Sequence, residues 1–163
     1  MDIELLFAAL LAVLSRVPEP MRGCIERRRH DIVQQIHFAA LAQGVPPAVL
    51  MVVGMLESHY GCSPRSGGCW GAPIDPTHRR TAGTPRHAAV ALATGFRVCR
   101  TWQGAISRFR CGLCACRSQP GRGYSAEYAA RLVERVHDRA GWPLAPGAMR
   151  RRRDPHDRSA SLR

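Results

Sequence analysis

The feature that most constrains this chain is an unbroken apolar segment that follows two prolines and ends at an acidic residue. Pro46 and Pro47 stand where proline is favoured, at the beginning of a helix. Residues 48–56 after them carry no charged side chain. A helix that is apolar around nearly its whole circumference is surrounded by protein, so helix 47–57 is predicted to be the buried helix of the domain.

Helical periodicity recurs on both sides of this segment, and no stretch has the convincing pattern of a strand. We expect helices at about residues 2–16, 24–42, 47–57, 87–98, 101–109 and 125–140. Gly44 suits the end of the second helix, and Ser125 suits the N-cap of the last one. The fold class is therefore predicted to be all-α, with a short strand or turn allowed only within residues 58–86.

Residues 58–86 have a different composition, rich in glycine and proline and without a period. A loop of this length in a compact domain is usually either functional or disordered. The cysteines at 62 and 69 and the tryptophan at 70 argue against disorder. We expect an ordered, functional loop.

The 163 residues suit one domain with tails. Residues 5–14 have the length of the apolar core of an export signal, but Asp2 and Glu4 precede them where a signal has basic residues. Residues 1–20 are thus either an apolar N-terminal helix or a degenerate export signal. Residues 21–142 form the main domain, and the arginine-rich residues 143–163 are predicted to be a disordered tail.

The charge balance of the chain is strongly basic. The 24 basic residues, all arginine, exceed the 12 acidic ones and give a net charge of +12. Such a field favours an anionic partner, which is nucleic acid, an acidic membrane or a cell wall rich in carboxylates and phosphates.

Seven cysteines are many for this length and favour disulfides in an exported chain. Short loops favour pairing of Cys62 with Cys69, and of Cys99 with one of the cysteines at 111–116. A zinc site built from Cys99, Cys111, Cys114 and Cys116 is the alternative for the second group. The odd count leaves at least one thiol unpaired within a single chain.

Glu57 is the first charged residue of the apolar helix, and it stands at the helix end. Partial burial and the negative end of the helix dipole both favour the protonated form of a carboxyl group. A carboxylic acid that stays protonated near neutral pH is what a general acid for glycosidic cleavage requires. A purely structural Glu is unfavourable here, because helix ends prefer cations.

Four motifs in the right order resemble the lysozyme-like superfamily, and within it the soluble lytic transglycosylases. Residues 40–46 (ALAQGVP) and 55–61 (MLESHYG) resemble the helix–turn–helix entry and the Glu-Ser motif of that superfamily. Residues 102–112 (WQGAISRFRCG) and 124–133 (YSAEYAARLV) resemble its later tryptophan and tyrosine helices. The resemblance spans about residues 30–140 and implies a lysozyme-like catalytic domain within 21–142.

Two departures concern substrate contacts. The loop glutamine of the transglycosylases is missing from residues 71–74, and their Tyr-Asn pair is replaced by Phe109 and Arg110. The spacing Glu57-Ser58-x-x-Gly61-x-Ser63, followed by Trp70-Gly71, is also similar to bacterial N-acetylglucosaminidases of the flagellar and autolysin type. Both families place a glutamate at the helix end.

The resemblance implies that Glu57 acts alone on the glycan between N-acetylmuramic acid and N-acetylglucosamine and forms a 1,6-anhydro product. A second carboxylate would have to be Asp75, which is otherwise a turn residue before proline. The other expected substrate-binding residues are Ser58, His59, Tyr60, Trp70, Phe109 and Tyr128. Core packing is the alternative for Trp70 and for Tyr128.

The resemblance implies no cofactor and no metal. We expect a monomeric peptidoglycan-binding protein, exported to the periplasm, cell wall or medium or associated with a phage. The N-terminal helix and the arginine tail would make weak contacts with a membrane or anionic wall polymer, without specific nucleic-acid binding. The alternatives are a peptidoglycan hydrolase and a catalytically inactive wall-binding module of the same fold.

Overall fold

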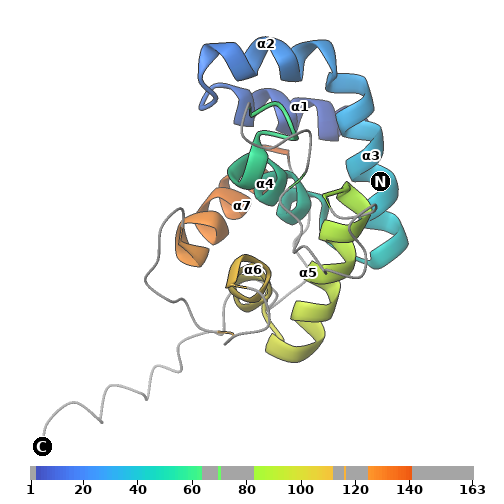
Figure 1. The fold of residues 1–163 in the computed structure, drawn as a ribbon, viewed down its shortest axis with the longest axis vertical. Coiled ribbons are helices and arrows are strands. Elements are labelled where there is room, and N and C mark those ends of the chain that lie inside the picture. The colour runs from blue at the N-terminus through green and yellow to red at the C-terminus, as the bar shows by residue number, and fades with distance from the viewer. Residues whose placement is uncertain (1–2, 64–69, 71–82, 112–115, 117–124, 141–163) are drawn as a thin grey trace, which may run out of the picture.

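The computed structural model describes residues 3–63, 70, 83–111, 116 and 125–140. Within these residues the protein is all-α, as predicted, and contains no strand. The helices are α1 (Ile3–Leu14), α2 (Glu19–Arg27), α3 (Arg29–Gln43), α4 (Pro47–Ser58), α5 (Pro85–Cys99), α6 (Trp102–Cys111) and α7 (Ala126–Ala140). Figure 1 shows them gathered around α4.

Helix α4 is the buried centre of the molecule, which confirms the prediction from the apolar segment. Eight consecutive residues, from Ala48 to Met55, are buried. Helices α1, α3, α5 and α7 all pack against α4. Because every side of α4 meets protein, the position of its last turn is fixed by the core.

Helix α1 belongs to the same core. It packs against α3, α4 and α7, and Leu6 and Leu10 have at most 1% of their surface exposed. Within residues 1–20, the apolar segment Ile3–Leu14 is a helix packed into the core of the domain. None of the described helices combines the length and the apolar character that crossing a bilayer requires.

The single helix expected at 24–42 is wrong. The chain instead forms α2 and α3, which meet at Arg28, whose φ of −103° and ψ of 8° interrupt the helix. Helix α2 begins at Glu19, because Pro20 lies in its first turn, where no intrahelical N–H is needed. Pro18 and Pro20, which follow the first predicted helix, therefore stand at the start of α2.

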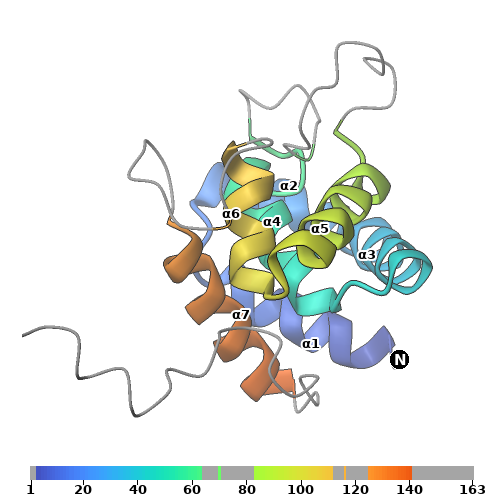
Figure 2. The same cartoon turned by 90° about the horizontal axis from the view of Figure 1, so that it is seen from below.

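Four helix ends are turned toward the same side of the molecule. Figures 1 and 2 show the end of α4, the beginning of α5, the end of α6 and the beginning of α7 on this side. Two predicted helix caps are confirmed: Gly44 ends α3 in the left-handed conformation, and the Ser125 hydroxyl at the start of α7 accepts a hydrogen bond from the Tyr128 N–H at 3.1 Å. Among the motifs that resemble a catalytic family, residues 55–61 lie at the end of α4, residues 102–111 form α6 and residues 126–133 begin α7, whereas residues 40–46 join α3 to α4.

Two disulfides join distant parts of the described chain. Cys24 of α2 bonds Cys62, and Cys99 bonds Cys116. The predicted Cys62–Cys69 pair is wrong, because the fold places the residues after α4 against α2. The pairing of Cys99 within the downstream cluster is confirmed, and it excludes the zinc site that needed Cys99 and Cys116 as thiolates. Disulfides indicate an oxidising, exported environment.

Candidate functional site

Glu57 lies in the last turn of α4 and is half-buried. Ser58 follows it with only 2% of its surface exposed. The eight buried residues before Glu57 leave the helix no freedom to rotate, so the carboxyl group leaves the core at a fixed point.

The chain after Glu57 forms a left-handed turn. His59, Tyr60 and Gly61 have consecutive φ values of 51°, 58° and 80°. Only glycine adopts this region without cost, and consecutive left-handed residues are rare. Backbone strain of this kind concentrates at functional sites and persists where surrounding contacts hold it.

Hydrogen bonds close this turn onto the end of α4. The Tyr60 N–H donates to the Gly54 carbonyl at 2.9 Å, and the Gly61 N–H donates to the Ser58 hydroxyl oxygen at 2.9 Å. The Ser63 N–H donates to the Ser58 carbonyl at 3.0 Å. Ser58, expected to contact substrate, is thus buried and bonded within the turn.

Two aromatic rings support the turn from the core. Tyr60 and Trp70 are buried, with ring centroids 5.3 Å apart. A Cβ at Gly54 would lie 2.5 Å from the Trp70 ring and 3.0 Å from the Tyr60 ring, so this glycine lets both rings reach α4. Neither ring presents a face to a ligand, so the structure favours core packing over direct sugar contact for both.

The Tyr60 phenol is unusual in its burial. Among the described residues its hydroxyl has no hydrogen-bond partner, and burial raises the pKa of the phenol far above its ordinary value. The ring therefore anchors the turn by packing rather than by polar contacts.

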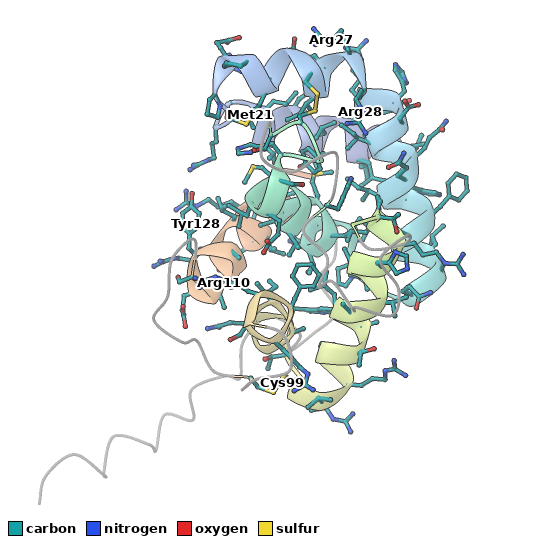
Figure 3. The ribbon with its side chains drawn as sticks, in the orientation of Figure 1. Met21, Arg27, Arg28, Cys99, Arg110 and Tyr128 are labelled. Atoms are coloured by element: carbon teal, nitrogen blue, oxygen red, sulfur yellow. A yellow bond between two sulfur atoms is a disulfide. The ribbon has the colours of Figure 1, made fainter. Side chains whose placement is uncertain are left out.

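Arg28 and the first disulfide hold the turn from outside. The Arg28 guanidinium donates to the Tyr60 carbonyl at 3.4 Å and lies 3.8 Å from the Cys62 sulfur. Cys62 in turn is bonded to Cys24 of α2. Figure 3 labels Arg28 where α2 meets α3, beside the turn that follows α4.

His59 is the residue of the turn with a partly exposed side chain and an ionisable ring. It is half-buried, and burial lowers its pKa below the ordinary 6.5. A neutral imidazole two residues from Glu57 can donate and accept hydrogen bonds without adding charge.

The other predicted residues divide into core and surface. Phe109 of α6 is buried at 5% exposure, so it belongs to the core. Tyr128 is 39% exposed at the beginning of α7, which excludes the core alternative for it. Arg110 and Tyr128 are labelled in Figure 3, on α6 and α7. Asp75 lies outside the described residues.

Sequence reasoning missed Arg28, Cys24 and Gly54. A glycine inside a strong helix pattern indicates close packing, and this was the available indication for Gly54. No local pattern pairs Cys24 with a cysteine 38 residues away, nor aims Arg28 at a carbonyl across the fold. These contacts follow only from the packing of α2 against the turn.

The chain was compared with protein-family models, curated proteins and solved structures, and none of them matches it.

Proposed function

We propose that this protein cleaves peptidoglycan glycan strands with Glu57 as the single general acid and base. The observation that carries the proposal is the placement of Glu57, a half-buried residue at the end of a helix with eight consecutive buried residues, followed by a turn held in a strained conformation. Geometry that is fixed before substrate binds is what acid–base catalysis needs.

The reaction needs one carboxyl group. Glu57 donates a proton to the glycosidic oxygen between N-acetylmuramic acid and N-acetylglucosamine, and the substrate acetamido group stabilises the developing cation. Glu57, now a carboxylate, takes the proton of the C6 hydroxyl, whose oxygen closes the 1,6-anhydro ring. No water is consumed, and Glu57 regains its proton.

The sequence supports a single-carboxylate reaction. Asp75 is the only acidic residue between Glu57 and Glu127. Ordinary glycosidases use two carboxyl groups on either side of the bond. If Asp75 positions a water, the protein is a hydrolase, an N-acetylglucosaminidase or a muramidase, with the same Glu57 as acid.

Tyr128 and His59 are the partly exposed groups proposed to contact the substrate. Tyrosine offers an apolar ring face and a hydroxyl, a combination suited to sugars. The two disulfides fit an exported protein that meets the cell wall, and the net charge of +12 fits attraction to anionic wall polymer. We place the protein in the periplasm, cell wall or medium, or on a phage particle.

The mass of the products tests the proposal and selects among the alternatives. Purified peptidoglycan treated with the protein should release fragments about 20 mass units lighter than the hydrolysed, reduced fragments, for one water and two hydrogens. Fragments without this deficit would show a hydrolase. Binding to the wall without released fragments would show an inactive module and contradict the proposal.

A further inference from the structure

We infer that Arg28 and the Cys24–Cys62 disulfide are positioning groups for Glu57, acting through the left-handed turn at residues 59–61. This inference rests on the proposed function of Glu57. It assigns a catalytic consequence to two features on α2 and at the α2–α3 junction, neither of which touches the substrate.

The turn at residues 59–61 fixes the backbone of Glu57. Tyr60 N–H bonds the carbonyl of Gly54, before Glu57, and Ser63 N–H bonds the carbonyl of Ser58, directly after it. Opening the turn would free the end of α4, because these bonds satisfy carbonyl groups in the last part of the helix. The direction of the carboxyl group is therefore coupled to the turn.

The left-handed conformation of the turn needs contacts from outside the turn. Residues 59 and 60 are not glycine, so their φ values of 51° and 58° are disfavoured and require contacts from outside. Burial of Tyr60 supplies one contact from the core. Two further contacts come from Arg28, at the Tyr60 carbonyl, and from the covalent bond at Cys62.

The contacts made by Arg28 and by the Cys24–Cys62 disulfide act on the same few atoms of the turn. The Arg28 guanidinium lies within 3.4 Å of the Tyr60 carbonyl oxygen and 3.8 Å of the Cys62 sulfur. It therefore bridges the strained residue and the disulfide. Loss of either contact should loosen the turn while the buried residues of α4 stay in place.

The test compares two disulfides that close loops of 38 and 17 residues. Loop-closure entropy grows slowly with length, so Cys24→Ala/Cys62→Ala and Cys99→Ala/Cys116→Ala should lose similar stability. Arg28→Ala and Arg28→Lys form the second pair. Each variant is assayed for peptidoglycan turnover at saturating and limiting substrate, and for hydrogen exchange of the Tyr60 and Gly61 amides.

We expect Cys24→Ala/Cys62→Ala and Arg28→Ala to lower kcat by about tenfold to a hundredfold with little change in KM, since misplacement by about 1 Å costs this much. Their Tyr60 and Gly61 amides should exchange faster. Arg28→Lys, which retains a donor, should recover most of kcat. Cys99→Ala/Cys116→Ala should keep kcat within about twofold and leave these two amides protected.

Full kcat in both Cys24→Ala/Cys62→Ala and Arg28→Ala would overturn the inference while Glu57 remains the acid. Equal kcat losses in the two disulfide variants would also overturn it, because the effect would then be general destabilisation. Failure of the proposed function is a separate result: the unsubstituted protein and Glu57→Gln would both leave peptidoglycan intact.

Discussion

At the scale of single residues, the site depends on a backbone conformation that side chains rarely adopt. The two non-glycine residues of the left-handed turn cost about 2–4 kcal/mol together. His59 is a residue that tolerates this region better than most, whereas Tyr60 is bulky and is held by its buried ring. Sequence reasoning proposed Glu57 and its neighbours as the site, but could not predict which of these residues are buried and which are partly exposed.

His59 should make the stability of the protein depend on pH. Burial lowers its pKa from 6.5. Between the lower folded pKa and the unfolded pKa, the unfolded chain therefore binds a proton that the folded chain does not. The contribution of neutral His59 to the free energy of unfolding is therefore fully present above about pH 6.5 and is lost as the pH falls through the lower folded pKa. The variant His59→Asn keeps a residue suited to the left-handed region but does not titrate.

The free energy of unfolding, measured by urea denaturation, should fall less between about pH 7 and pH 5 in His59→Asn than in the unsubstituted protein. An identical pH dependence of the two proteins would show that burial at this turn does not lower the pKa of His59.

Tyr60 should act through its ring and not through its hydroxyl. Because the hydroxyl is buried and without a partner among the described residues, Tyr60→Phe should be neutral or stabilise the protein by about 1 kcal/mol. Tyr60→Ala should destabilise it by about 3–5 kcal/mol. Thermal unfolding measures both, and a loss of lytic activity in a stable Tyr60→Phe variant would instead support the original assignment of Tyr60 to substrate binding.

At the scale of elements, the helix boundaries predicted from periodicity and caps agree with α1 and α4–α7 to within a few residues. The error concerns α2 and α3, because one amphipathic pattern runs across a break that only the Arg28 backbone reveals. The disulfide at Cys62 was mispredicted for a related reason, since sequence proximity says nothing of how α2 folds back.

Two glycines in helices test the packing of α4. Gly54→Ala should destabilise the protein by about 1–3 kcal/mol, because the new Cβ would overlap the Trp70 ring at 2.5 Å despite the better helix propensity of alanine. Gly23→Ala on α2 is the matched control. Its Cβ would meet only the flexible end of Arg27 at 3.6 Å, so it should stabilise the protein by up to about 1 kcal/mol.

Thermal or urea unfolding of both variants gives the comparison. Equal stabilisation by the two substitutions would mean that Trp70 does not lie against Gly54.

At the scale of the whole molecule, α1 decides whether the N-terminal segment is a structural part of the domain. The predicted domain boundary at residue 20 separates α1 from the main domain, although α1 packs on α3, α4 and α7. The fold class could be predicted because the helical periods are strong. The integration of α1 could not, because an apolar run of this length also suits an export signal.

Leu6→Ala should therefore destabilise the protein by about 2–5 kcal/mol, as expected for a leucine with no exposed surface. A chain that begins after residue 16 should lose cooperative unfolding. If the shortened chain unfolded with the same Tm as the full chain, α1 would be dispensable and the export-signal interpretation would hold.

The central claim is that Glu57 is the acid that cuts glycan, and the substitution Glu57→Gln tests it most directly. The measurement is the rate at which purified peptidoglycan releases soluble fragments. The matched control is Glu134→Gln, because Glu134 is also a half-buried glutamate but lies on α7. We predict that Glu57→Gln lowers this rate by about a hundredfold or more at unchanged Tm, because an amide cannot donate the proton. We predict that Glu134→Gln retains the rate. Persistent lysis by a folded Glu57→Gln variant would contradict the account.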